Sequence, residues 1–269
     1  MSEAKGRVLI LAGSDSGGGA GIQADIKAVT ALGGYAATAV TAITVQDTLG
    51  VHGVHPIPLD VVEAQAKVVL ADIGADAIKT GMLATVETVE LVARLLDGEA
   101  RGIPAVVDPV MVAKGGHALL EDRAVAAVRE LMLPRAFLLT PNAPEAEALT
   151  GVAVADIDGQ RRAGERLLEL GCRAVLMKGG HVPGDTVVDL LLTTDGETTF
   201  EGPRLDTRST HGTGCTLASA CAAGIAQGMR LEEAVARAWA YVAEAIRQAP
   251  GFGRGHGPLD HAWPLRGRA

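Results

Sequence analysis

Short apolar runs rich in β-branched residues alternate along this chain with longer segments of helical periodicity. This alternation is typical of a parallel β-sheet covered by helices, because a crossover between parallel strands needs a helix. We expect strands at residues 8–11, 38–43, 77–79, 105–107, 137–139 and 174–177. We expect helices at about 20–32, 59–70, 86–96, 118–131, 159–170, 216–227 and 231–248.

One region departs from the alternation. Residues 187–192 and 198–200 flank Asp195-Gly196, a dipeptide that favours a hairpin, so we expect antiparallel strands at one edge. The sequence contains no internal repeat, low-complexity tract or Pro/Ser linker. We therefore predict one α/β domain over residues 1–269, doubly wound, with helices on both faces of a mainly parallel sheet and a few antiparallel edge strands.

The charge balance excludes a large class of partners. The 269 residues include 24 Lys and Arg against 32 Asp and Glu, a net charge of −8, and only 3% are aromatic. A surface that follows nucleic acid needs clustered cations, and single strands also need aromatic platforms. We therefore expect no nucleic-acid partner and a core built from Ala, Val, Leu and Ile.

Three cysteines, Cys172, Cys215 and Cys221, form no CxxC pair and leave an odd number. Free thiols are typical of a reducing compartment. The apolar run at 8–12 is too short for a signal peptide, and no stretch approaches the ~20 apolar residues of a membrane span. We expect a cytoplasmic protein that does not bind a membrane.

Polar residues follow three of the expected strands. Asp108 comes after 105–107, Asn142 and Glu145 come after 137–139, and Lys178 comes after 174–177. In doubly wound sheets these strand ends border one ligand crevice. Carboxylates for Mg²⁺ and a cation for phosphate are what a metal-nucleotide site needs. Each residue also has a structural interpretation: Asp108-Pro109 could start a turn, and Asn142 with Glu145 matches a helix capping box.

The segment 210–216 (THGTGCT) precedes a helical pattern and is the strongest single motif. Glycines let the backbone approach a ligand, and free N–H groups at a helix start attract anions. Such an anion hole would stabilise charge on a transferring phosphoryl group. Cys215 would lie at this helix start, where a thiol pKa is lowered. The alternative is an ordinary glycine turn beside a small buried cysteine.

A second glycine-rich loop, 13–21, contains Gly19-x-Gly21-x-x-Ala24, which fits the dinucleotide fingerprint superficially. Gly19 lies well beyond the end of the first strand, and no acidic residue follows a second strand to complete the motif, so the fit is poor. The chain also lacks a GxxxxGK[ST] loop. Any ATP chemistry must therefore use another phosphate cradle.

Two further features are a pair of histidines and a glycine-rich segment near the end of the sequence. His52 and His55 form an HxxH pair that we expect in a loop, and without an HExxH motif a zinc site is not expected. The glycine-rich segment 251–257 either orders near a ligand or is a flexible terminus.

Over nearly its full length the chain resembles the bacterial hydroxymethylpyrimidine/phosphomethylpyrimidine kinases of thiamine biosynthesis, in the ribokinase-like superfamily. The matching segments are 12–15 (AGSD), 20–25 (AGIQAD), 45–48 (VQDT), 79–83 (KTGML), 107–111 (VDPVM), 177–181 (MKGGH), 211–216 (HGTGCT) and 255–258 (GHGP). The Gly-Thr-Gly-Cys sequence is the most specific, because most ribokinase-like enzymes have Asp where Cys215 stands. Gly17 and Ser209 depart from residues common in the family.

The resemblance implies MgATP-dependent phosphorylation of 4-amino-5-hydroxymethyl-2-methylpyrimidine and then of its monophosphate, by a homodimer. Its implied pyrimidine pocket consists of Gly13, Asp25, Gln46 and Met82. It assigns the metal to Asp108 and Glu145, and the nucleotide to Lys178, Thr213 and Asn142. It places catalysis at Lys178 and at the backbone N–H groups of Gly212, Gly214 and Cys215.

Some alternatives stay open at this point. Cys215 could act as a general base or only through its backbone N–H, since a loose phosphoryl transition state needs little base assistance. A vitamin B6 kinase, an NAD(P)-linked oxidoreductase and a non-catalytic nucleotide-binding regulator are the rival functions.

Overall fold

The computed structural model describes residues 6–111 and 122–266. All strands of this part form one nine-stranded sheet in the order β3-β2-β1-β4-β5-β6-β7-β8-β9. The strands are β1 (Arg7–Asp15), β2 (Tyr35–Gln46), β3 (Val51–Pro56), β4 (Ala77–Thr80), β5 (Ala105–Val107), β6 (Leu138–Leu139), β7 (Ala174–Met177), β8 (Thr186–Thr193) and β9 (Gly196–Pro203). The helices are α1 (Gly21–Ala31), α2 (Leu59–Asp72), α3 (Val86–Asp97), α4 (Asp122–Ala127), α5 (Ala143–Thr150), α6 (Ile157–Glu169), α7 (Thr213–Ala226) and α8 (Leu231–Arg247).

The central strands β2, β1, β4, β5, β6 and β7 are parallel, and the strands at both edges are antiparallel. The hairpin expected around Asp195-Gly196 is confirmed as β8 and β9. At the other edge β3 pairs antiparallel with β2, which the sequence did not predict. The mainly parallel α/β sheet is therefore confirmed, with one more antiparallel edge strand.

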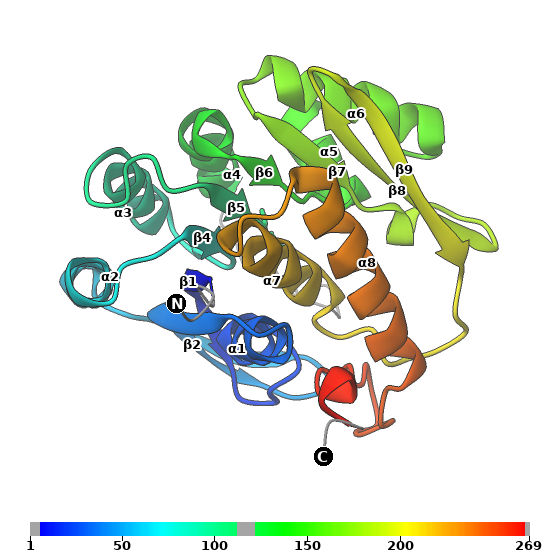
Figure 1. The fold of residues 1–269 in the computed structure, drawn as a ribbon, viewed down its shortest axis with the longest axis horizontal. Coiled ribbons are helices and arrows are strands. Elements are labelled where there is room, and N and C mark those ends of the chain that lie inside the picture. The colour runs from blue at the N-terminus through cyan, green and yellow to red at the C-terminus, as the bar shows by residue number, and fades with distance from the viewer. Residues whose placement is uncertain (1–5, 112–121, 267–269) are drawn as a thin grey trace.

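Helices cover both faces of the sheet (Figure 1). Alternate residues of β1 point to opposite sides, so Val8 and Ile10 pack in one buried cluster and Leu9 and Leu11 in the other. The first cluster includes residues of α1, α7 and α8, and the second includes residues of α2, α3, α5 and α6. Small and aliphatic side chains build both clusters, as the low aromatic content predicted.

Most predicted helices and strands are confirmed, and the differences occur where the sequence pattern is weak. β5 and β7 have the predicted bounds, whereas α7 begins at Thr213, three residues before the predicted start. The short helix α5 was not predicted. His52 and His55 lie on β3 and not in a loop; β3 has few apolar residues because it is an edge strand with exposed side chains. The expected helix 118–131 falls partly outside the described residues, and its remainder is α4 followed by the π-helical turn Val128–Met132.

No helix within residues 6–111 and 122–266 is long and apolar enough to cross a membrane.

Candidate active site

A cavity of about 900 Å³ opens at the carboxyl ends of the parallel strands. Its size suits a small-molecule site, and doubly wound sheets bind ligands in this place. Of the twelve residues predicted for the site, all but Asp25 line this cavity. They are Gly13, Gln46, Met82, Asp108, Asn142, Glu145, Lys178, Gly212, Thr213, Gly214 and Cys215.

Asp108, Glu145 and Lys178 form a cluster of charges on the cavity wall. The Lys178 ammonium donates to Oδ1 of Asp108 at 3.0 Å, and Oε2 of Glu145 lies 3.7 Å from the same Nζ. Thr140, next to β6, donates to the same Asp108 oxygen at 3.1 Å. The prediction that these strand ends meet is therefore confirmed.

Asn142 and Glu145 also form the capping box that the sequence left open. The Asn142 side chain accepts from the Glu145 N–H at 2.9 Å, and the Glu145 carboxylate accepts from the Asn142 N–H at 2.8 Å. Asn142 and Glu145 therefore cap the helix α5 and also line the cavity. Burial raises the pKa of Glu145 to about 7; the positive charge of Lys178 opposes this, and the negative charge of Asp108 adds to it.

The carboxylates are suited to Mg²⁺, which prefers hard oxygen ligands. Thr140 and Lys178 both donate to Oδ1 of Asp108, and the two carboxylate oxygens, Oδ2 and Oδ1, lie 3.7 and 4.0 Å from where a Cβ of Gly214 would be. In the part of the chain that the structure describes, no group of three or more His, Cys, Asp or Glu could hold a metal ion. Mg²⁺ at this place would therefore need phosphate and water oxygens as well, as it usually does with nucleotides.

The N-terminus of α7 faces the same cavity. Gly212 is the N-cap residue, and Thr213, Gly214 and Cys215 form the first turn. The first N–H groups of a helix have no partner within it, and the helix dipole adds partial positive charge there. The predicted anion-binding position therefore lies next to the charges of Asp108 and Lys178.

Close packing explains why two of these residues are glycine. Gly212 has a φ of 80°, and a Cβ on it would lie 1.8 Å from the carbonyl oxygen of Gly19. A Cβ on Gly214 would lie 3.1 Å from the Lys178 Nζ. The backbone of this turn thus packs directly on the first glycine loop and on the catalytic lysine candidate.

The glycines of the superficial dinucleotide motif serve the same loop packing. A Cβ on Gly19 would lie 2.5 Å from the ring of His211, and one on Gly21 would lie 2.5 Å from the carbonyl oxygen of Gly13. These positions face protein atoms, so they need no pyrophosphate to explain them.

Cys215 contradicts one prediction. The position at the start of α7 was expected to lower the pKa of its thiol, but burial raises that pKa to about 12. The positive charge of Lys79 opposes the shift, whereas Asp25 and Asp108 add to it. The prediction was wrong because removal from water outweighs the effects that lower this pKa, which are the charge of Lys79 and a hydrogen bond with the Gly21 backbone.

Asp25 is the second correction, since it lies behind the cavity wall and is fully buried. Both of its oxygens accept from the Lys79 Nζ at 2.8 Å, and Ser219 donates to Oδ1 at 2.7 Å. Burial raises the pKa of Asp25, against the charge and hydrogen bonds of Lys79. The expected contact between this carboxylate and the pyrimidine ring is therefore replaced by an ion pair beneath the site.

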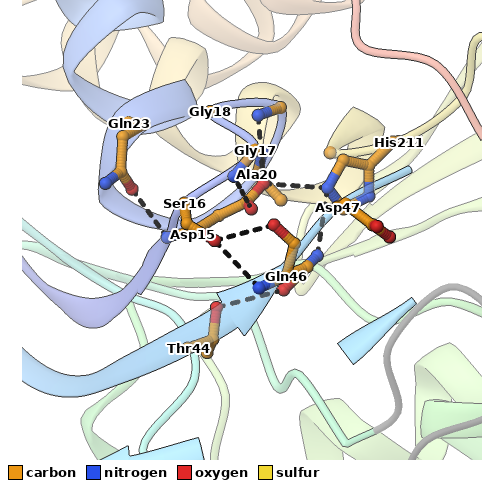
Figure 2. Close-up of polar contacts among 12 residues, drawn as sticks. Asp15, Ser16, Gly17, Gly18, Ala20, Gln23, Thr44, Gln46, Asp47 and His211 are labelled. Carbon is orange, nitrogen blue, oxygen red and sulfur yellow. Dashed lines mark hydrogen bonds and ion pairs between the residues drawn. The ribbon is translucent and has the colours of Figure 1, made fainter. Parts of the chain in front are cut away.

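Gln46, predicted for the pyrimidine pocket, lies in a polar network with Asp15 and His211 (Figure 2). Nε2 of His211 is 2.9 Å from Oδ2 of Asp15 and 3.0 Å from Nε2 of Gln46. Asp15 and His211 line the cavity, although neither was predicted as a site residue. No sequence pattern could have paired these two residues. They are 196 positions apart and meet only because the two glycine loops are in contact.

Lys79 and Asp189 also line the cavity without having been predicted for the site. Asp189 on β8 accepts from the Gly179 N–H at 2.7 Å and so fixes the turn after Lys178. Burial raises the pKa of Asp189 to about 6, opposed by hydrogen bonds from Gly179 and Trp239 and by the charge of Lys178. A lone Asp in a hairpin strand gives no sequence signal of this role.

The glycine-rich segment 251–257 is ordered against the site. The N–H of His256 donates to the Thr48 carbonyl at 2.7 Å, and the N–H of His211 donates to the Gly257 carbonyl at 3.1 Å. Of the two open interpretations, order near the ligand cavity is the one that the structure supports.

A charged cluster of Asp108, Glu145 and Lys178 thus lies beside an anion-attracting helix N-terminus in the ligand crevice of a doubly wound sheet. This fold and site define a kinase of the ribokinase-like class. Residues 15–260 match the model of the phosphomethylpyrimidine kinase family, and the chain belongs to that family.

Three relatives illustrate the similarity. The hydroxymethylpyrimidine/phosphomethylpyrimidine kinase of Streptomyces coelicolor is 51% identical over 258 residues, 96% of this chain and 95% of that protein. The thiamine biosynthesis bifunctional protein ThiED of Geobacter sulfurreducens is 51% identical over 257 residues, and the match covers 96% of this chain but only 52% of that protein. The structure of the Staphylococcus aureus pyridoxal kinase in complex with AMP-PCP and pyridoxal has a TM-score of 0.90 and 35% identity, and the match covers 98% of this chain and 96% of that one.

Proposed function

We propose that this protein uses ATP to phosphorylate 4-amino-5-hydroxymethyl-2-methylpyrimidine and then phosphorylates the monophosphate to the diphosphate, in thiamine biosynthesis. The observation that carries the proposal is one cavity that joins the Asp108–Lys178 pair to the N-terminus of α7. Family membership identifies the alcohol, and the cavity supplies the groups for phosphoryl transfer.

The ring end of the cavity is formed by Gly13, Gln46 and Met82. A Cβ on Gly13 would lie 3.2 Å from the Met82 sulfur, so only glycine leaves a flat wall beside that side chain. The Gln46 amide offers both a donor and an acceptor for a ring nitrogen and an amino group. These residues bind and orient the pyrimidine so that its hydroxymethyl group points to α7.

The phosphate end is formed by Lys178 and the first turn of α7. In the reaction the hydroxymethyl oxygen forms a bond to the γ-phosphorus, the bond between that phosphorus and the ADP oxygen breaks, and the hydroxyl proton is released. Negative charge on the transferring group is met by Lys178 and by the N–H groups of Gly212, Gly214 and Cys215. Catalysis arises from positioning and electrostatics, because the Cys215 thiol keeps its proton.

Mg²⁺ is part of the proposal, held by Asp108 and Glu145 directly or through water. The ion supplies positive charge that neutralises the phosphates. Asn142, the N-cap residue of α5, and Thr213, the first residue of α7, both line the cavity and would border the nucleotide. Loss of activity on chelation and its recovery with added Mg²⁺ would test this assignment.

The decisive experiment is ³¹P NMR of the products formed from MgATP and hydroxymethylpyrimidine. We expect the monophosphate first and then the diphosphate, with ADP. No phosphorylated pyrimidine at all would contradict the proposal. The variants Asp108→Ala and Lys178→Ala should lose at least ~100-fold in kcat with the fold intact, and unchanged rates for both would refute the site.

Vitamin B6 phosphorylation is the second candidate, favoured by the similarity to a pyridoxal kinase structure. The ratio of kcat/KM for the pyrimidine alcohol and for pyridoxal decides between them. An oxidoreductase is tested by binding of a nicotinamide cofactor, and a non-catalytic regulator by ADP release.

Several broader features belong to the same proposal. A homodimer is supported by exposed apolar side chains on β2 and α2, among them Ile43, Val45 and Val68, and sedimentation measurements test it. One domain over residues 1–269 is supported by the continuous sheet. A cytoplasmic location is supported by three free cysteines.

A further inference from the structure

Asp15 is a buried carboxylate with an unusually complete set of donors. Its Oδ1 accepts from the Gly17 N–H at 2.8 Å, and its Oδ2 accepts from the N–H groups of Gly19 at 3.0 Å and Ala20 at 2.8 Å. Burial alone would raise the pKa of Asp15, but the hydrogen bonds from His211 and from Ala20 and Gly17 outweigh it and lower that pKa. Asp15 is therefore ionised and presents only lone pairs to its neighbours.

His211 touches this carboxylate and the Gln46 amide with the same ring nitrogen, Nε2. A nitrogen without a proton would place its lone pair 2.9 Å from an Asp15 lone pair, which is repulsive. His211 therefore carries a proton on Nε2. A protonated Nε2 cannot accept from an amide N–H, so the amide end that it faces must be the carbonyl oxygen of Gln46.

Thr44 gives the same result at the other end of the amide. Its single hydroxyl hydrogen has two acceptors in reach, the Ser14 carbonyl at 2.7 Å and the Gln46 amide end at 3.3 Å. The shorter bond takes the hydrogen, and Thr44 is left with lone pairs towards Gln46. The amide end beside Thr44 must therefore be the NH₂ group. Nε2 of the Gln46 amide lies towards His211 and Oε1 towards Thr44 as the atoms are assigned, but the two ends of an amide are alike in shape, so the protons of its neighbours decide which end is which.

We propose that Asp15, His211 and Thr44 are positioning residues that fix the Gln46 amide with its carbonyl towards His211 and its NH₂ towards Thr44. The Gln46 backbone is held as well, because Ser16 donates to its carbonyl at 2.7 Å and accepts from its N–H at 2.9 Å. Figure 2 shows these contacts converging on Gln46. Asp15, Thr44 and His211 are nearly inaccessible to water, at 2%, 4% and 6% exposure, so solvent does not compete for them.

A fixed amide selects substrates by their hydrogen-bonding pattern, and this inference rests on the proposed function. After its bonds to His211 and Thr44, the amide keeps one carbonyl lone pair and one N–H. An aminopyrimidine offers the matching donor and acceptor side by side, in its amino group and the adjacent ring nitrogen. Pyridoxal lacks that pair, so a fixed amide favours the pyrimidine alcohol over vitamin B6.

The proton on His211 can be measured without any substrate. Protein labelled with ¹⁵N in its histidine rings gives two-bond ¹H–¹⁵N correlations, and the His211 signals are those that vanish in His211→Gln. We expect Nε2 of His211 to be a protonated, pyrrole-type nitrogen. A pyridine-type Nε2 would overturn the proposal, whatever the activity of the enzyme.

Matched variants test the consequence for specificity. His211→Gln keeps an N–H that reaches Asp15 and Gln46, whereas His211→Leu removes it; Thr44→Ser keeps the hydroxyl, whereas Thr44→Val removes it. We expect His211→Leu and Thr44→Val to raise KM for the pyrimidine alcohol about 10-fold, with kcat and KM for MgATP within about 3-fold. The conservative variants should stay within about 3-fold of the wild type in all three constants.

The ratio of kcat/KM for the pyrimidine alcohol to that for pyridoxal should fall about 10-fold in Thr44→Val and His211→Leu. If His211→Leu does not fold, Thr44→Val and the NMR measurement still decide. An unchanged ratio in Thr44→Val would overturn the positioning role. A wild-type enzyme that phosphorylates neither alcohol would contradict the proposed function alone and leave the NMR result in force.

Discussion

Cys215 shows how burial determines the chemistry of one residue. With a pKa raised to about 12, its thiol supplies almost no thiolate near neutral pH, so the proposed function assigns the catalytic role to the backbone N–H. We predict that Cys215→Ala keeps kcat within about tenfold of the wild type, because this substitution retains the N–H. Steady-state kinetics with MgATP and the pyrimidine alcohol measures it. A loss of about 100-fold or more, restored in part by Cys215→Ser, would instead establish a role for the side chain.

Glu145 gives the stability of the protein a pH dependence. Its pKa is about 7 in the fold against 4.5 for an ordinary glutamate, chiefly because it is buried. A carboxyl group whose pKa is higher in the folded than in the unfolded state contributes to the free energy of unfolding. This contribution is complete below about pH 4.5 and is lost as the pH rises through about 7. We predict that the free energy of unfolding falls by about 1–3 kcal/mol more between pH 5 and pH 8 in the wild type than in Glu145→Gln.

Urea denaturation at a series of pH values measures this difference. Glutamine keeps the capping box with Asn142, and Asp189 is present in both proteins, so the difference isolates the charge of Glu145. Parallel curves for the two proteins would contradict the prediction.

At the scale of elements, the join between the two glycine loops depends on Gly212. A Cβ there would lie 1.8 Å from the Gly19 carbonyl oxygen, in addition to the strain of a φ of 80°. Gly228 provides a matched control, because its φ is 79° and no atom lies within 4 Å of the same Cβ position. We predict a loss of about 1 kcal/mol for Gly228→Ala and at least about 3 kcal/mol for Gly212→Ala.

Thermal or urea unfolding measures both losses, and kcat should fall only in Gly212→Ala because the proposed anion site lies at the start of α7. Equal losses of stability in the two variants would contradict the prediction, because the contact between the two glycine loops would then contribute little to the free energy of unfolding.

At the scale of the whole molecule, the Asp25–Lys79 pair connects α1, β4 and α7, since Ser219 on α7 donates to the same carboxylate. Removal of one buried charge leaves the other without a partner. We predict that Lys79→Met costs about 3–5 kcal/mol. Asp25→Asn should cost much less when it is added to Lys79→Met than when it is made in the wild type. Exposed Arg230 and Glu233 form a control pair, for which Glu233→Gln should leave the stability nearly unchanged. A double-mutant cycle measured by urea unfolding tests this, and additive losses would contradict it.

The sequence by itself determined the α/β alternation, the edge hairpin and the strand ends that carry Asp108, Glu145 and Lys178. These follow from local patterns: the hydrophobic period, turn residues and the rule that parallel strands present their carboxyl ends at one edge. It also identified the glycine turn at 212–214, because a helix start with glycines is a local motif.

Only the tertiary structure decided what surrounds each of these groups. It placed Cys215 in a partly buried position where loss of water raises the pKa of its thiol, it placed Asp25 in an ion pair with Lys79 behind the cavity wall, and it brought Asp15 to His211. Desolvation and hydrogen bonds between distant residues depend on how the chain packs and not on the order of its residues. For that reason the sequence could predict that these residues meet at one cavity, whereas their protonation and their partners required the folded chain.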